Sequence, residues 1–66
     1  MATNVASDID LQIGKTVRAR REKAGLTQAD LGRAIGVTFQ QVQKYERGTN
    51  RVSAAAMVRV ADALKC

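Results

Sequence analysis

The stretch 38–48, TFQQVQKYERG, concentrates side chains that make directional polar contacts. It contains three glutamines and a lysine, namely Gln40, Gln41, Gln43 and Lys44. A glutamine amide donates and accepts hydrogen bonds, and a lysine ammonium donates three. Such groups add little to a hydrophobic core, so we expect them to contact a partner outside the protein.

Catalytic chemistry has few candidate residues in this chain. There is no histidine, the one cysteine is the last residue, Cys66, and the carboxylates are scattered. Neither a metal-ligand cluster nor a phosphate-binding loop is present in the sequence. We therefore expect a protein that is not an enzyme and that uses no cofactor, metal or small-molecule ligand.

The charge of the chain is strongly basic. Eleven Lys and Arg residues oppose six Asp and Glu, for a net charge of +5, and every base follows residue 14. This balance favours a polyanionic partner, nucleic acid first and an anionic membrane surface second, against a solvated basic surface with no partner. No apolar run approaches the ~20 residues of a membrane span. The N-terminus does not resemble a secretory signal, and we expect a cytoplasmic protein.

Turn and cap signals divide the chain into four helical segments without a strand. Residues 1–8 are small and polar and are expected to form a flexible arm. Asp8 or Asp10 is expected to cap the first helix, which ends at Gly25. Its narrow apolar stripe consists of Ile13, Val17 and Ala24.

Two short helices follow in the middle of the chain. The first is expected over residues 28–35, with Thr27 as its N-cap, Asp30 in its first turn and Gly36 after its end. Thr38 can cap the next helix, which Gly48 ends.

These two segments match a pattern of seven constrained positions. A close helix crossing needs a residue without bulk, here Gly32, and the turn needs a positive φ, here Gly36. The seam between the helices is apolar and consists of Leu31, Ile35, Val37, Val42 and Tyr45. The pattern predicts a helix-turn-helix.

The last segment is a core-facing helix capped by Ser53. Its apolar residues recur at helical spacing and are Met57, Val60, Ala61 and Leu64. It reaches Leu64 and Cys66 without a C-cap, so we expect a longer natural chain that covers this end. The expected fold is all-α, a compact bundle of four or five short helices with a central helix-turn-helix, in which residues 9–66 form one domain.

The segment GLTQADLGRAIGV followed by TFQQVQKYERG resembles the Cro/C1-type (XRE) family of lambda-repressor-like helix-turn-helix domains, over about residues 11–66. The resemblance implies an all-α bundle whose third helix enters the major groove of double-stranded DNA, usually as a homodimer on a two-fold site. Two residues depart from the family pattern. Gly32 stands where alanine is more common, and Phe39 where a polar base-reading residue is common.

Four residues of the third helix and its cap are candidates for reading DNA bases. Glutamine can pair with adenine, lysine with guanine, and a phenylalanine edge or threonine methyl can lie against the thymine methyl. The first turn of the helix goes deepest into the groove. The predicted base readers are Thr38, Phe39, Gln40 and Lys44. The alternative is a solvated helix face, and Phe39 has the further alternative of packing on a neighbour or a dimer partner.

Contacts to the DNA backbone are expected around the same helix. At the start of the second helix, free N–H groups favour an anion, and the family match places a backbone contact there. The predicted backbone-binding residues are Gln28, Gln41, Gln43, Arg47, Asn50 and Arg51. The resemblance also implies a partly buried, structural ion pair between Arg21 and Glu46.

The expected function is sequence-specific double-stranded DNA binding by a transcriptional regulator of the repressor type. An antitoxin or adaptor module on the same fold is the alternative, with Phe39 and the end of the last helix as its contact surfaces. A membrane-surface helix is a third reading, because residues 18–23 are basic, although the apolar stripe of that helix is thin.

Overall fold

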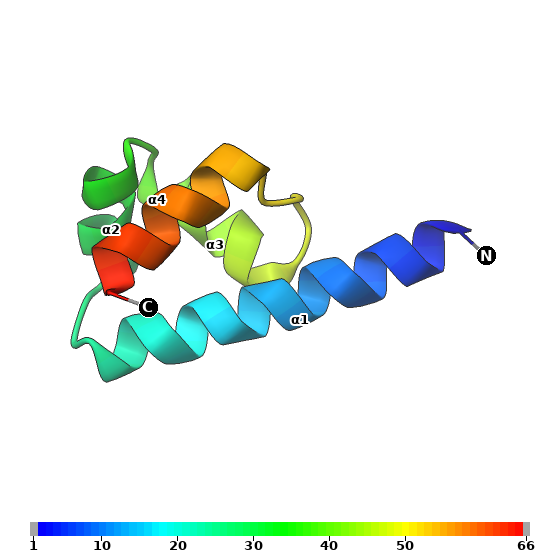
Figure 1. The fold of residues 1–66 in the computed structure, drawn as a ribbon, viewed down its shortest axis with the longest axis horizontal. Helices are drawn as coiled ribbons and strands as arrows, with labels where there is room; N and C mark the ends of the chain where they lie inside the picture. Colours follow the sequence, from blue (N-terminus) through cyan, green and yellow to red (C-terminus); the bar gives the residue numbers. More distant parts are fainter. Residues whose placement is uncertain (1, 66) are drawn as a thin grey trace.

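The computed structural model describes residues 2–65, and their side chains from Asp8 onward. Its elements are four helices, α1 (Ala2–Lys23), α2 (Gln28–Ile35), α3 (Phe39–Arg47) and α4 (Ala54–Leu64), with no strand among the described residues. In Figure 1 the second half of α1 lies along one side of the bundle, and its first half continues past the other three helices. The all-α class is confirmed. No helix in the described range combines the length and the apolar character of a membrane span.

The start of α1 differs from the sequence-based prediction. The helix begins at Ala2, so the expected cap at Asp8 or Asp10 is wrong. No glycine or proline interrupts residues 2–8, and a helix that has already nucleated gains a hydrogen bond with each added residue. Met1 lies outside the described residues, and the flexibility that we expect of residues 1–8 stays a prediction.

The caps of α2 and α3 are as predicted. The Thr27 hydroxyl accepts from the Asp30 backbone N–H at 3.0 Å, and the Asp30 carboxylate accepts from the Thr27 N–H at 3.0 Å, which completes a capping box. The Thr38 hydroxyl accepts from the Gln41 N–H at 3.2 Å. Gly36 ends α2 at φ 80° and Gly48 ends α3 at φ 77°, in the left-handed region that glycine tolerates best.

The prediction for the start of α4 is confirmed, and the prediction for its end is wrong. Ser53 caps the first turn, and its hydroxyl accepts from the Ala56 N–H at 3.1 Å. The expectation of a missing C-cap is wrong, since Lys65 adopts a left-handed conformation at φ 58° and its N–H points to the Ala61 and Asp62 carbonyls. A lysine can occupy this conformation at a modest cost in backbone energy.

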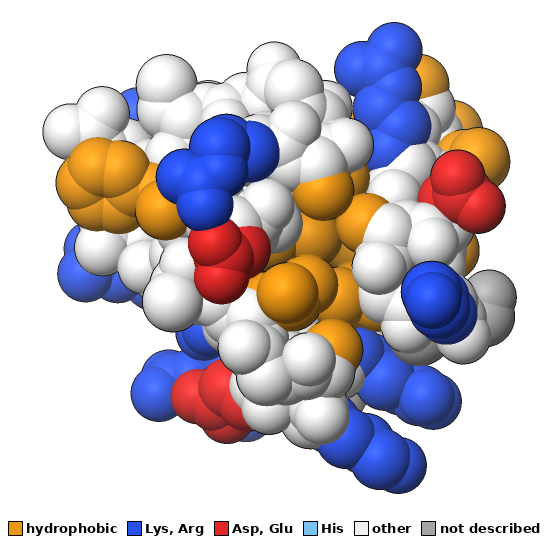
Figure 2. Space-filling model, turned by 90° about the vertical axis from the view of Figure 1, so that its left-hand side faces the viewer, with side chains coloured by type: hydrophobic (Ala, Val, Ile, Leu, Met, Phe, Trp, Pro, Cys, Tyr) orange, Lys and Arg blue, Asp and Glu red, His pale blue; other side chains and the backbone are white. Residues whose placement is uncertain are grey.

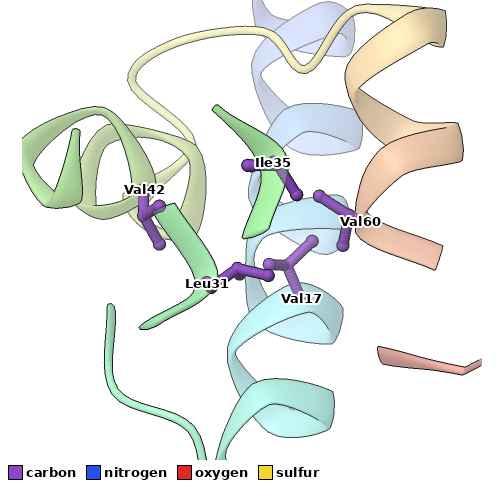
Figure 3. Packing of buried hydrophobic residues seen from close by; sticks show 5 residues of the cluster. All are labelled: Val17, Leu31, Ile35, Val42 and Val60. Atoms are coloured by element: carbon purple, nitrogen blue, oxygen red, sulfur yellow. The ribbon is translucent and has the colours of Figure 1, made fainter. Parts of the chain in front are cut away.

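The core is aliphatic and draws on all four helices. Figure 3 shows its buried centre, where one side chain from α1, two from α2, one from α3 and one from α4 meet. These residues are Val17, Leu31, Ile35, Val42 and Val60. The partly buried residues around them are Ile13, Val37, Tyr45, Ala63 and Leu64. The predicted seam of the helix-turn-helix is thereby confirmed.

Three positions of the core differ from expectation. Ala24 is exposed, because α1 ends at Lys23 and the chain turns away there. Met57 is also largely exposed, and Ala63 takes part in the packing of α4 instead. Val52 is buried in the connection between α3 and α4, where its neighbours Thr49, Asn50 and Arg51 are polar and exposed. One apolar side chain there can fill space under the loop without changing its polar composition.

Three glycines allow backbones to approach closely, and a Cβ at one of them, Gly48, would lie 2.9 Å from the Leu11 Cα. A Cβ at Gly32 would lie 2.6 Å from the Val37 carbonyl oxygen, in the turn that leads into α3. The prediction that this position must lack bulk is therefore confirmed. Gly14 was not predicted. A Cβ there would lie 2.5 Å from the Tyr45 oxygen and 2.6 Å from the Glu46 oxygen. Gly14 therefore lets α1 lie directly on the last turn of α3.

Candidate nucleic-acid interface

The candidate interface is the exposed side of α3. Val42 and Glu46 of this helix are buried, whereas all four predicted base readers are exposed: Thr38, Phe39, Gln40 and Lys44. Phe39 is 48% exposed, a high value for a large apolar side chain. The structure thus brings the four residues together on a surface that the core does not use.

The remaining glutamines of α3 lie in different places. At about 100° per residue, Gln43 falls between Phe39 and Arg47 on the exposed face, and Gln41 falls towards Tyr45 at its edge. Both side chains are half-buried. On the helix surface Gln43 therefore lies between predicted base readers and Gln41 lies beside them, and the backbone-binding role expected of both stays a prediction.

Three predicted backbone-binding residues, Arg47, Asn50 and Arg51, follow one another at the end of α3 and are exposed. The backbone here folds back on the helix, since the Thr49 N–H donates to the Lys44 carbonyl at 3.1 Å. The Arg51 side chain is 70% exposed, and its Nε lies 3.8 Å from a carboxylate oxygen of Asp10 on α1. With 70% of its side chain exposed, Arg51 can also reach a further anion.

Gln28, the first residue of α2, lies beside the last turn of α3. Its side-chain amide donates to the Glu46 carboxylate at 3.1 Å. The sequence predicted a contact to the DNA backbone here, and the structure shows a half-buried side chain with one protein contact already made.

A buried ion pair connects α1 to α3. The Arg21 Nε donates to Glu46 Oε2 at 2.7 Å, and Arg21 Nη2 donates to Glu46 Oε1 at 3.2 Å. The two side chains are 10% and 3% exposed. The predicted pair is confirmed, and its burial is deeper than the partial burial that was expected. The hydrogen bond to Glu46 raises the pKa of Arg21 above its ordinary value, so the guanidinium stays charged.

The capping box at the start of α2 carries the second shifted group. The pKa of Asp30 is lowered most by a hydrogen bond from the Thr27 backbone and next by one from the Thr27 side chain. The positive charge of the nearby Arg33 lowers it further. Arg33 also pairs directly with Asp30. The positive Arg33 offsets the negative charge that Asp30 places at this helix end.

A second surface feature lies on another side of the bundle. An apolar groove of about 320 Å³ runs between α1 and α4. Its lining consists of Gln12, Ile13, Thr16, Val17, Arg20, Met57, Val60, Ala61 and Leu64. Figure 2, which views the end of the molecule nearest α2, shows apolar side chains gathered at the centre of that face with Lys and Arg around them. The sequence indicates an uncovered end of the last helix but does not predict a groove.

These features define a helix-turn-helix domain: a short capped helix, a glycine turn, and a second helix whose inner side is locked and whose outer side is polar. The comparison with protein families agrees with this assignment to the helix-turn-helix class. The helix-turn-helix family model matches residues 17–66, so the chain belongs to this family. The resemblance to Cro/C1-type domains is confirmed.

Individual relatives carry names of the same kind. The chain is 52% identical over 60 residues to the uncharacterized HTH-type transcriptional regulator y4aM of Sinorhizobium fredii, covering 91% of this chain and 42% of the relative. It is 48% identical over 62 residues to an uncharacterized transcriptional regulator in the ATPase CF(0) region of Rhodospirillum rubrum, covering 94% and 57%. A more distant match, 32% over 54 residues, is repressor protein C2 of Salmonella phage P22, covering 82% and 25%. The chain thus spans about half or less of the length of these relatives.

Proposed function

We propose that this chain is the sequence-specific, double-stranded DNA-binding domain of a transcriptional regulator, acting in the cytoplasm. In this proposal α3 enters the major groove, and Thr38, Phe39, Gln40 and Lys44 contact base edges. The surrounding backbone contacts come from Gln28, Gln41, Gln43, Arg47, Asn50 and Arg51. The proposal includes no catalytic step and no cofactor.

The observation that carries the proposal is the division of α3 into two faces. Its inner face is held by the core, by the buried ion pair to α1 and by the close approach of Gly14. Its outer face presents amides and an ammonium, the groups that pair with base edges. Rigid placement of polar groups on an exposed helix is what readout in a groove requires.

We further propose a repressor that binds as a homodimer to a two-fold site. The family resemblance and the name of the P22 relative, a repressor protein, support this proposal. A dimer of helix-turn-helix domains binds two half-sites about 10 base pairs apart.

Selection of bound duplexes from a random DNA pool tests the proposal. We expect an enriched palindrome with half-sites about 10 base pairs apart and an affinity that falls steeply with salt. Enrichment without a palindrome would remove the dimer and keep the base reading. Binding without any enriched sequence would contradict sequence-specific readout by α3.

A second candidate is a protein-interaction module of the antitoxin or adaptor type. The apolar groove between α1 and α4 and the exposed Phe39 are the observations that favour it. The variant Phe39→Ala separates the candidates when the selected duplex is available. A DNA-binding domain loses affinity for that duplex, whereas an adaptor retains whatever weak DNA binding its charge supports.

A further inference from the structure

Gln28 contacts the buried ion pair through a hydrogen bond whose direction is determined by chemistry. Its Nε2 lies 3.1 Å from Glu46 Oε1. An ionised carboxylate only accepts hydrogen bonds, so the amide nitrogen of Gln28, and not its oxygen, must face Glu46. The orientation of this amide is therefore set by its partner, which is not the case for a solvated glutamine.

The same bond leaves one donor of the amide unused by Glu46. The Gln28 side chain has two N–H groups on Nε2, and the contact with Glu46 takes one of them. Glu46 is almost fully buried while Gln28 is half-buried. The inner N–H therefore points into the protein, and the second is left for an acceptor on the solvent side, at the first turn of α2.

Arg21 makes this arrangement compatible with an anionic ligand. A bare carboxylate next to a phosphate would repel it, but the bidentate guanidinium neutralises Glu46. Arg21 Nη1 also donates to the Leu26 carbonyl at 2.8 Å, two residues before Gln28. One guanidinium thus holds both the carboxylate and the segment that leads into α2.

We propose that Glu46 is a positioning residue for DNA: by accepting one Nε2 hydrogen of Gln28, it directs the other to a backbone phosphate. This inference rests on the proposed function, since it assumes that the first turn of α2 faces DNA. Glu46 itself does not touch the phosphate. It acts through Gln28, and its negative charge is cancelled by Arg21.

A double-mutant cycle on DNA affinity tests the proposal. The probe is a random-sequence duplex of about 20 base pairs at low salt, because a phosphate contact carries no sequence information. Gln28→Ala should weaken binding roughly tenfold in the unmodified chain. In a chain with Arg21→Met and Glu46→Met, which replaces the pair by apolar groups, the same change should weaken binding less than about twofold.

Each other outcome has a definite meaning. An equal loss in both backgrounds overturns the proposal, because Gln28 would then act without Glu46. Binding that is indifferent to Gln28→Ala in the unmodified chain also overturns it, and leaves the proposed function standing if Arg51→Ala still weakens binding. If the unmodified chain binds no duplex, the proposed function falls as well.

If the doubly substituted chain does not fold, a measurement on the unmodified chain tests whether Glu46 holds the Gln28 amide in place. The Gln28 side-chain amide should have an NMR order parameter near that of rigid backbone, about 0.85, before DNA is added. The exposed Gln40 amide is the internal control and should be mobile. On addition of the duplex, one Gln28 amide proton should shift and the other, on Glu46, should not. An order parameter below about 0.6 in the free protein overturns the proposal.

Discussion

The Glu46 carboxylate accepts hydrogen bonds from two nitrogens of the Arg21 guanidinium, at 2.7 and 3.2 Å, across 25 residues of sequence. The pair joins α1 to the last turn of α3 inside the protein, where the two side chains are only 10% and 3% exposed. Because Gln28 donates to the same carboxylate, three helices meet at one buried group. The stability of the helix-turn-helix and the placement of the side that we propose to bind DNA therefore depend on a common contact.

Replacing one partner of this ion pair should destabilise the folded chain far more than replacing both. Arg21→Met or Glu46→Met alone leaves an uncompensated buried charge and should lower the free energy of unfolding by about 3–5 kcal/mol. The double substitution should cost much less than the sum of the two. Urea unfolding followed by circular dichroism measures all three chains. Single substitutions that cost less than about 1 kcal/mol would show that the pair is solvated.

Gly14→Ala should destabilise the protein, although alanine is the better helix former by about 1 kcal/mol. The added Cβ would lie 2.5 Å from the Tyr45 oxygen, so α1 and α3 would have to separate. We expect a loss of about 1–3 kcal/mol. Ala19→Gly, an exposed change in the same helix, is the control and should cost about 1 kcal/mol from helix propensity alone. A Gly14→Ala chain that is more stable than the unmodified one would mean that the two backbones are not in contact.

Gln40→Ala should weaken binding to the selected DNA site by about 1–3 kcal/mol and relax the preference at one base pair. The reason is that Gln40 is exposed on the first turn of α3, where a bidentate pair with adenine is available. Competition binding against duplexes that vary one base pair at a time measures the effect. Gln41→Ala, at the edge of that face, is the matched control and should leave base preference intact. Equal losses on every duplex would argue against base reading by Gln40.

Arg51→Ala should weaken binding to all DNA sequences alike and reduce the slope of log affinity against log salt by about 1. Its guanidinium is exposed just beyond α3, where a flanking phosphate is expected. Arg59→Ala removes the same charge from α4 and should leave the slope unchanged. Equal effects of the two substitutions would indicate a response to net charge only.

Acid should weaken the N-terminal cap of α2. The pKa of Asp30 is lowered in the folded chain by hydrogen bonds from Thr27, so near pH 4 the folded chain binds fewer protons than the unfolded one. The stability that the ionised Asp30 carboxylate gives the folded chain is therefore complete above the ordinary aspartate pKa, about 3.9. It is lost as the pH falls through the lower pKa that Asp30 has in the folded chain. Urea midpoints of the unmodified chain and Asp30→Asn should converge as the pH is lowered. A difference that stays constant with pH would contradict this assignment.

Local chemistry explains which parts of the fold were predictable. The caps at Thr27, Thr38 and Ser53 each bond to a backbone N–H three residues away, so neighbouring residues are enough to place them. The apolar seam of the helix-turn-helix follows from spacing in the same way. The beginning of α1 was misplaced because an aspartate can cap a helix but does not have to, and nothing before it breaks the helix.

The sequence by itself determined both ends of α2 and α3, the start of α4, the helix-turn-helix and the basic, amide-rich face that we assign to DNA. These features depend on contacts within a turn or two of helix. Only the tertiary structure decided that Gly14 brings α1 onto α3, that a groove lies between α1 and α4, and that Gln28 is held by Glu46. Those relationships arise where helices cross, and the angle and depth of a crossing are set by the packing of the whole core, which residue spacing along the chain does not specify.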